Sequence, residues 1–174
     1  FGVGPTGMMD VMLAHAKKFS KIFCFDVNDF RLDFAKKFNI TDSISSMDEN
    51  RKQKILDNTD GQGVDVAIVA TSSLKALDDA IDMTRKGGTV MMFGVPSKGA
   101  ILDLDMSKIY SKEITLVTSY AASDSDTKEA LDLIESSQID VKQLITHTYS
   151  ISDSQKAFDH ARTGKNAMKI IITK

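Results

Sequence analysis

Hydrophobic and polar positions divide the chain into helical and extended segments. Met8, Met12 and Ala16 recur at the spacing of one helix face, which predicts a helix over about 6–19. The run KIFCFDV at 21–27 is short, apolar and rich in β-forming residues, which predicts a buried strand. The same reasoning predicts helices at 28–38, 49–58 and 73–84, the last stopped by KGG at 86–88, and strands at 42–46, 64–71, 89–95 and 113–119.

Continuously apolar strands that alternate with helices are typical of strands covered on both faces. We therefore predict an α/β fold with a doubly wound, Rossmann-like parallel sheet. Only Phe1 precedes the first glycine, so we expect the first strand of this sheet to be truncated. After Tyr120 the pattern changes, and we expect a domain over 1–120 followed by a separate C-terminal segment over 121–174. That segment is expected to contain helices at 124–136 and 151–162 and extended runs at 142–150 and 167–173.

Composition excludes several classes of function. The chain has 174 residues, enough for one ordinary domain with a sizeable core. Lys and Arg number 22 against 24 Asp and Glu, which gives no sign of nucleic acid or of an anionic membrane as a partner. The single cysteine excludes an internal disulfide and an all-cysteine metal cluster. Without a long apolar run or a signal peptide, the sequence predicts a cytoplasmic domain.

The first residues contain a candidate phosphate-binding loop. Gly2, Gly4 and Gly7, with Pro5 and Thr6 between them, fit the G-x-G-x-x-G pattern of dinucleotide-binding turns. This chemistry needs a tight turn, a backbone that a pyrophosphate can approach, and close contact between helix and strand. A helix that starts near Thr6 directs free N–H groups and the positive end of its dipole at an anion.

An acidic residue strengthens this hypothesis. Asp26 ends the next strand 19 residues after Gly7, where a carboxylate can accept hydrogen bonds from both hydroxyls of an adenosine ribose. An aspartate that caps the following helix is a compatible alternative. The carboxylate would repel a 2′-phosphate, and Val27 and Asn28 follow where NADP binders tend to have a small residue and an arginine. The sequence therefore favours NAD as the cofactor.

With these motifs, the chain resembles the medium-chain, zinc-dependent alcohol and polyol dehydrogenases. The similar segments, in the family's order, are GVGPTGMM, FDVNDFRLDFAKKF, DGQGVDVAIVATSS, RKGGTVMMFGVP, LDLDMSKIYSKEITLVTSY and LITHTYSISDSQKAFDHARTGKNAMKIIITK. They cover essentially the whole chain but correspond only to the cofactor-binding half and the C-terminus of such enzymes. In the family a preceding domain carries the zinc ligands, so zinc is expected only in that domain, and the C-terminal segment is expected to return towards it.

The resemblance implies further cofactor-binding residues. Arg31 matches a basic residue that helps to hold the adenosine ribose, and Lys169 matches one close to the pyrophosphate. The alternatives are a solvated helix arginine at 31 and a charge on the outward face of a terminal strand at 169. Other implied positions follow strand ends and are Thr71 and Ser72, Gly94 and Val95, and Ser119, Tyr120 and Ala121. Ala121 departs from the family, because polyol dehydrogenases often have an arginine near this position.

Other reactive residues have simpler interpretations. Cys24 lies within an apolar strand and is expected to be a buried small hydrophobe. His147 is expected to be structural rather than a metal ligand, and His15 and His160 to be exposed on helices. Asp79 is expected to lie with its acidic neighbours on a solvated helix face. We identify no catalytic residue and no metal ligand in this chain.

The sequence thus predicts the cofactor-binding part of an NAD-dependent, zinc-type dehydrogenase that acts on an alcohol or polyol and is inactive as this piece alone. Alternatives are a stand-alone NAD-binding or sensing module, and the zinc-free quinone or enoyl reductase branch, which normally has an alanine-rich loop and prefers NADPH. The run AILDLDM at 100–106 is expected to be an edge strand through which a homodimer or tetramer forms. The alternatives are that this run is a loop, or that Asp103 and Asp105 oppose such pairing.

Overall fold

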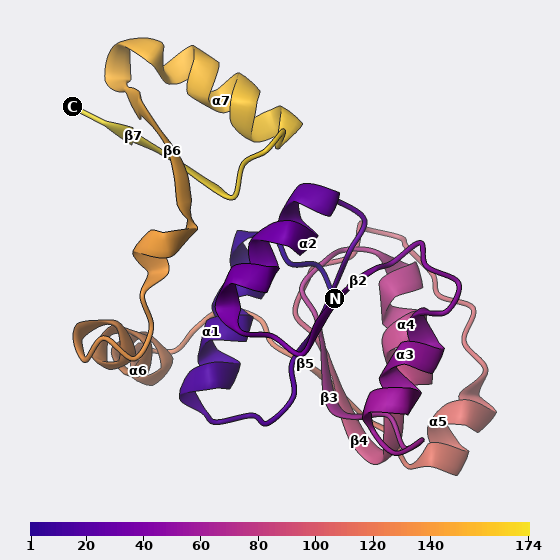
Figure 1. Cartoon of the computed structure of the whole chain (residues 1–174). Helices are drawn as coiled ribbons and strands as arrows, with labels where there is room; N and C mark the ends of the chain where they lie inside the picture. The colour runs from indigo at the N-terminus through magenta and orange to yellow at the C-terminus, as the bar shows by residue number, and fades with distance from the viewer.

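The computed structural model describes all 174 residues and contains an α/β body with a C-terminal unit beside it (Figure 1). The α-helices are α1 (Pro5–Ala16), α2 (Asp29–Ala35), α3 (Arg51–Asn58), α4 (Leu74–Met83), α5 (Met106–Lys112), α6 (Asp124–Glu135) and α7 (Ser154–Thr163). The strands are β1 (Phe23–Asp26), β2 (Asp42–Ser45), β3 (Val64–Val69), β4 (Thr84–Met92), β5 (Thr115–Thr118), β6 (Ile145–Ser150) and β7 (Lys169–Thr173). Short 3₁₀ turns cover Lys36–Phe38, Val141–Leu144 and Ile151–Asp153.

The body contains two groups of parallel strands, which confirms the predicted fold class. β1 pairs with β2, while β3, β4 and β5 pair in that order. The first residues of the chain join the two groups. The Phe1 amine donates to Ile68 O at 2.7 Å, Ala70 N–H donates to Phe1 O at 2.8 Å, and Gly2 N–H donates to Phe25 O at 2.7 Å. Phe1 and Gly2 therefore lie between β1 and β3 and are hydrogen-bonded to both.

Helices cover both faces of these strands, and each face has its own apolar core. One core contains Cys24 of β1 with Met8 and Val11 of α1 and Phe34 of α2. On the opposite face, Phe25 of β1 packs with residues from β2, α3 and α4. A third cluster joins β3 and β4 to α4. Cys24 is 1% exposed, so its prediction as a buried hydrophobe is confirmed.

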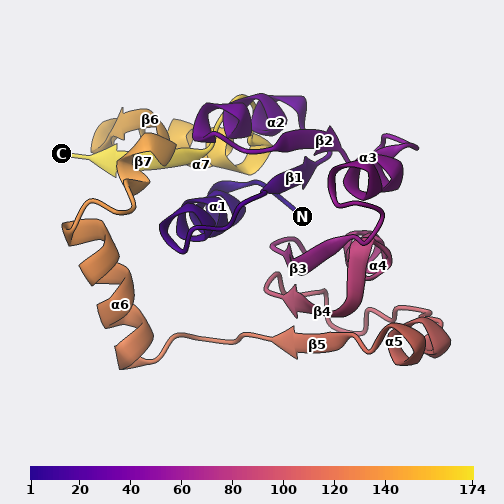
Figure 2. The same cartoon turned by 60° about the horizontal axis from the view of Figure 1, so that its bottom comes forward.

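The C-terminal unit consists of the parallel pair β6–β7 and helix α7 (Figures 1 and 2). Leu144 and Met168 belong to the core of α1 and α2 and attach the unit to the body. α6 connects the body to this unit, has no buried residue, and is tied to α1 by the Lys17–Glu129 ion pair at 2.7 Å. None of the helices combines the length and apolar character that crossing a membrane would require.

The predicted helix at 73–84 matches α4 within one residue, but the prediction that KGG stops it is wrong. The helix ends at Met83, and KGG at 86–88 lies inside β4. Thr84 Oγ1 donates to the carbonyl of Ala80, and the Lys112 ammonium donates to the carbonyls of Ile81, Asp82 and Thr84 at 2.9–3.1 Å. A lysine from another helix therefore satisfies the last carbonyls of α4, which no local signal indicated.

The segment 100–106 is not a strand in this structure, contrary to the prediction. Leu102 and Leu104 pack against the β3–β4–α4 cluster, whereas Ile101 is 87% exposed. No strand pairs with it, because β5 pairs only with β4. Asp105 caps α5 by accepting from Ser107 N–H at 2.9 Å, so the polar run that follows is a helix.

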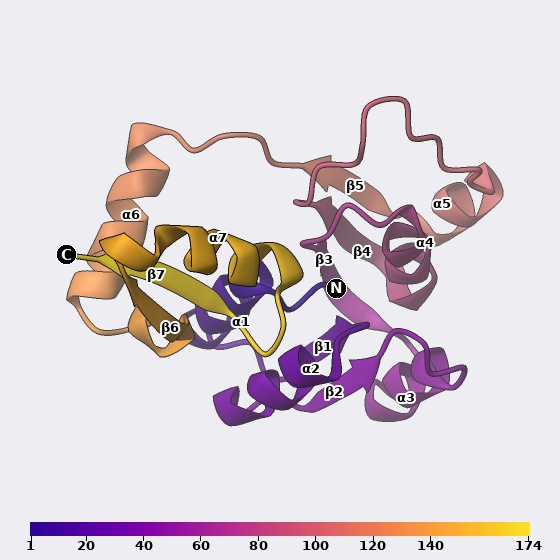
Figure 3. The ribbon, with the colours of Figure 1, turned by 90° about the horizontal axis from the view of Figure 1, so that it is seen from above.

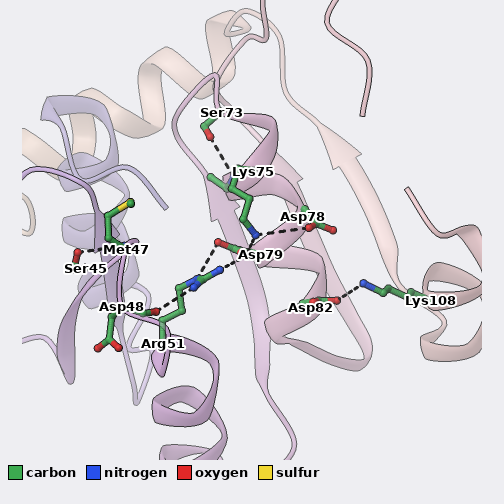
Figure 4. A network of polar contacts seen from close by, with 11 residues as sticks. Ser45, Met47, Asp48, Arg51, Ser73, Lys75, Asp78, Asp79, Asp82 and Lys108 are labelled. Atoms are coloured by element: carbon green, nitrogen blue, oxygen red, sulfur yellow. Dashed lines mark hydrogen bonds and ion pairs between the residues drawn. The ribbon is translucent and has the colours of Figure 1, made fainter. Parts of the chain in front are cut away.

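Asp79 is buried, which contradicts its prediction as part of a solvated face (Figure 4). Its carboxylate accepts from Arg51 Nε at 3.0 Å, Arg51 Nη2 at 2.9 Å and Lys75 Nζ at 2.6 Å. Burial alone would raise the pKa of Asp79, but the hydrogen bonds from Arg51 and Lys75 lower it overall. This bidentate contact joins α3 to α4 below the ends of β2 and β3, while Asp78 and Asp82 of the same helix stay partly exposed.

Two histidine predictions also need correction. His15 and His160 are partly buried rather than exposed. A nitrogen of His15 lies 2.6 Å from Phe38 O, and His160 lies 2.8 Å from the Tyr149 hydroxyl and 2.7 Å from Lys165 O. The His147 ring packs edge-on against His160, which accords with a structural role.

Candidate functional site

The glycine loop lies between Phe1 and α1. Gly2 has φ of +84°, a conformation that favours glycine, and turns the chain there. A Cβ on Gly7 would lie 1.9 Å from Gly2 O, so the first turn of α1 packs directly on the backbone of the loop. Two of the three glycines thus have the roles that the motif requires, a turn and a close contact.

The start of α1 directs free donors towards this loop. Gly4 is the N-cap, no side chain caps the helix, and Pro5 has no N–H to satisfy. The first hydrogen bond of the helix is Met8 N–H to Gly4 O at 2.9 Å. The N–H groups of Thr6 and Gly7 therefore have no partner in the helix, and with the helix dipole they favour an anion.

Asp26 is fixed beside the loop and is 6% exposed. Its Oδ2 accepts from the backbone N–H of Val3 at 2.9 Å, and its Oδ1 accepts from that of Asn28 at 3.0 Å. The carboxylate therefore holds the glycine loop against the end of β1. Each oxygen has a second lone pair, so the group can accept further hydrogen bonds from a ligand. Asn28 itself caps α2 by accepting from Arg31 N–H.

The guanidinium of Arg31 lies beside the glycine loop and Asp26. Its guanidinium lies against Gly4, where a Cβ would be 3.4 Å from Nη1, and Nη1 is 3.8 Å from Asp26 Oδ2. Its side chain makes no hydrogen bond, and Nε is buried without a partner. An arginine has five N–H donors, so this one is available to oxygen acceptors placed above the loop.

Two other predicted positions meet the loop at the ends of β3 and β4. A Cβ on Gly2 would lie 3.0 Å from Thr71 Cβ, and a Cβ on Gly94 would lie 2.3 Å from Thr71 O. Gly2, Thr71 and Gly94 thus come together at the carboxyl edge of the central strands, where open α/β sheets bind ligands. Ser72 and Val95 follow at this edge and are exposed.

The remaining predicted residues are less closely associated with the loop. Val27 is 71% exposed next to Asp26. Ser119, Tyr120 and Ala121 follow β5 and are exposed, with Tyr120 at 90%. Lys169 begins β7, is exposed and makes no ion pair. No hydrogen bond or ion pair joins these residues to the glycine loop.

Sequence reasoning missed Gly164, through which the C-terminal unit reaches the site. Gly164 ends α7 with φ of +61°, and a Cβ there would lie 3.8 Å from Arg31 Nη2. Arg31 is therefore placed between the glycine loop and the end of α7. The only local signal was a glycine after a helical pattern, which indicates a helix end but not what the end contacts.

Residues 5–136 match the family model described as zinc-binding dehydrogenase. The chain is 33% identical to the probable D-xylulose reductase A of Emericella nidulans, over 98% of this chain and 48% of that protein. It is 31% identical to the sorbitol dehydrogenase of Halalkalibacterium halodurans, over 99% of this chain and 50% of the other. The chain thus spans about half the length of the curated relatives that it matches.

Among solved structures, a short-chain alcohol dehydrogenase of Escherichia coli complexed with NADH superposes with a TM-score of 0.87. The match covers 99% of this chain and 50% of the other at 19% identity, so it shows a shared fold. The family model covers well over half of the chain, and the relatives carry dehydrogenase and reductase names. The chain belongs to the zinc-binding dehydrogenase family.

Proposed function

We propose that this chain is the cofactor-binding part of an NAD-dependent, zinc-type dehydrogenase that acts on an alcohol or polyol. The observation that carries the proposal is the convergence of three groups around the loop. These are the uncapped start of α1, the Asp26 carboxylate and the Arg31 guanidinium without a hydrogen-bond partner. The free N–H groups of α1 and the guanidinium of Arg31 can donate to the oxygens of a pyrophosphate. The Asp26 carboxylate can accept hydrogen bonds from ribose hydroxyls.

The residues present fit NAD better than NADP. A 2′-phosphate would add negative charge beside the buried Asp26 carboxylate, which Arg31 offsets only at 3.8 Å. NAD would accept a hydride when bound. The contribution of this chain is to orient the cofactor: Thr71 would line the ligand-binding edge of the sheet, and Gly94 would lie on the nicotinamide side, as the family resemblance implies. The relative solved with NADH supports this choice through its shared fold.

In this proposal the zinc ion is bound outside residues 1–174. No three His, Cys, Asp or Glu side chains of this chain lie together in a way that could hold a metal ion. We place the zinc in the half of the longer relatives that this chain does not match, and expect residues 1–174 alone to be inactive. Residues 1–120 bind the cofactor, and residues 121–174 lie towards that zinc-carrying half.

The substrate class is inferred from names of relatives. D-xylulose reductase and sorbitol dehydrogenase act, by name, on sugars and polyols, which favours a polyol over a simple alcohol. The two alternatives are less well supported. Relatives of twice this length argue against a stand-alone sensing module, and the Gly4-Pro5 loop with Asp26 argues against the zinc-free reductase branch.

We also propose a cytoplasmic location and a homodimer or tetramer that forms through 100–106. The only cysteine is a buried thiol, so no disulfide requires an oxidising compartment. In the segment 100–106, Leu102 and Leu104 point inwards while Ile101 and Asp103 are exposed. This alternation is the pattern of an edge strand, and a second copy of the chain would supply the strand partner that the segment lacks within one chain.

Calorimetric titration of the chain with NAD and with NADP tests the cofactor assignment. We expect NAD to bind at least about tenfold more tightly than NADP. In NADP a phosphate replaces the ribose hydroxyl that would donate to Asp26, and losing one such charge-assisted hydrogen bond costs about 1.5–3 kcal/mol. Equal affinity for both dinucleotides, or binding of neither, would contradict the proposal. Assay with NAD, zinc and sorbitol should stay at background, and NADH production would overturn the location of the metal.

A further inference from the structure

The turn between α7 and β7, residues 164–167, lies against the candidate cofactor site. Figure 3 shows this connection reaching from the C-terminal unit towards α2, the helix that carries Arg31. A Cβ on Gly164, the first residue of the turn, would lie 3.8 Å from Arg31 Nη2. On the other side, a Cβ on Gly4 would lie 3.4 Å from Arg31 Nη1. The guanidinium therefore lies between the glycine loop and the α7–β7 turn.

The Arg31 side chain depends on these two neighbours for its orientation. It makes no hydrogen bond, its Nε is buried without a partner, and its ion pair with Asp26 is long at 3.8 Å. A long side chain without hydrogen bonds has several accessible rotamers unless packing excludes them. Packing between Gly4 and Gly164 is thus what restricts the guanidinium, so the place of the turn determines where its donors point.

His160 of α7 holds this turn. Its Nε2 lies 2.7 Å from Lys165 O, and its Nδ1 lies 2.8 Å from the Tyr149 hydroxyl. A carbonyl oxygen can only accept, so Nε2 donates to Lys165 O, and in the neutral ring Nδ1 accepts from Tyr149. The His147 ring packs edge-on against the His160 ring, with centroids 4.4 Å apart. The imidazole is therefore fixed at both nitrogens and by a second ring.

The α7–β7 turn has few other hydrogen bonds. Gly164 N–H donates to His160 O at 2.9 Å where α7 ends, and Ala167 N–H donates to Gly164 O at 3.4 Å. The bond from His160 to Lys165 O is the only hydrogen bond between a side chain and residues 164–167. Removing it would leave the middle of the turn without a contact to the rest of the C-terminal unit through hydrogen bonds.

We propose that His160 is a positioning residue of the cofactor site. Through Lys165 O it holds the α7–β7 turn against Arg31, and so keeps the guanidinium directed at the oxygens of a bound dinucleotide. A side chain that is ordered before binding loses less conformational freedom when the ligand arrives, so its contact adds more to affinity. The inference rests on the proposed function, because the cofactor assigned there is the ligand of Arg31.

Two replacements of His160 test the hydrogen bond to the turn. Glutamine carries its NH₂ near the position of Nε2 and can still donate to Lys165 O, whereas the shorter asparagine reaches only the position of Nδ1. In calorimetric titration with NAD, His160→Asn should bind at least about fivefold more weakly than the unchanged chain, and His160→Gln within about twofold of it. In an Arg31→Ala background, His160→Asn should cause no further loss. Equal affinity of the two His160 variants, or the same loss without Arg31, would overturn the proposal.

A control in the same unit separates positioning from general stability. Ile171→Ala removes part of a partly buried side chain of β7 that is paired with Thr148 and lies outside the turn. It should lower the melting temperature and leave NAD affinity within about twofold of the unchanged chain. If it weakens NAD binding as much as His160→Asn does, the stability of the C-terminal unit explains the loss, and the proposal is wrong.

Nuclear magnetic resonance tests the positioning without a cofactor. The order parameter of the Arg31 Nε–H group should fall below about 0.6 in His160→Asn and stay near that of the unchanged chain in His160→Gln. An equal order parameter in all three chains would contradict the proposal. The ¹⁵N shifts of His160 in the unchanged chain should show the Nε2–H tautomer, and an Nδ1–H tautomer would overturn the proposal even where a variant does not fold. If the unchanged chain binds no NAD, the proposed function fails, and the Arg31 order parameter alone decides whether His160 positions the guanidinium.

Discussion

Replacing Asp26 by asparagine separates the structural and the ligand-binding roles of this carboxylate. The side chain keeps its shape, but only one of its two terminal atoms can still accept a hydrogen bond. Val3 N–H and Asn28 N–H each donate to a different oxygen, so one backbone donor then faces an amide NH₂. Arg31 also loses its only ion pair.

The expected loss of stability follows from these contacts. Losing one hydrogen bond to a charged, buried acceptor costs about 1.5–3 kcal/mol. The Arg31 contact is long at 3.8 Å and its guanidinium is partly exposed, so it adds little. For a chain of this size, the melting temperature should fall by about 3–12 °C. Loss of the acceptor for the ribose hydroxyls should weaken NAD binding by about 10–150-fold and reduce the preference over NADP.

Thermal unfolding by circular dichroism and calorimetric titration with both dinucleotides measure the two effects. Asp29→Asn is the matched control, because Asp29 is an exposed aspartate in the first turn of α2 without a side-chain hydrogen bond. It should change stability by no more than about 1 kcal/mol, the usual helix-dipole contribution. An unchanged melting temperature in Asp26→Asn would refute the anchoring role, and an unchanged ratio of NAD to NADP affinity would refute the ribose contact.

Three further predictions follow from particular contacts. Gly7→Ala places a Cβ 1.9 Å from Gly2 O, so α1 and the loop must separate. We expect at least about 1–3 kcal/mol of destabilisation and loss of NAD binding in calorimetry. Full NAD binding by this variant would contradict the prediction. Burial raises the pKa of Asp10 from 3.8 to about 6, so its ionisation destabilises the fold progressively between these values and fully above them. Asp10→Asn should therefore stabilise the chain by about 1–2 kcal/mol at pH 8, allowing for partial solvent screening, and by nothing near pH 3.5 in urea unfolding; an equal effect at both pH values would be inconsistent with burial as the cause. Leu102→Pro removes a backbone donor from the proposed edge and should convert dimer to monomer in sedimentation at micromolar concentration, whereas an unchanged dimer would locate the interface elsewhere.

Local chemistry was sufficient to predict which residues come together in the candidate cofactor site. The spacing of Gly2, Gly4 and Gly7 and the position of Asp26 at a strand end depend on neighbours in the chain, and the structure brings these residues together. The alternation of apolar strands with amphipathic helices likewise predicted the parallel α/β body. Such signals are readable because backbone turns and periodic burial act over a few residues.

Other features depend on contacts between distant segments, which no local pattern records. Asp79 is buried because Arg51 approaches from another helix, and α4 ends where the Lys112 ammonium reaches its last carbonyls. Gly164 lies near Arg31 only because the C-terminal unit folds back onto α1 and α2. The run 100–106 has the alternation of a strand, yet a strand needs a neighbour to pair with, and no strand of this chain pairs with it. The sequence alone therefore determined the features that depend on short-range sterics and hydrophobic periodicity. Tertiary structure decided the burial of charges, the capping of α4 by a lysine of another helix, and strand pairing, because each requires a partner from elsewhere in the chain.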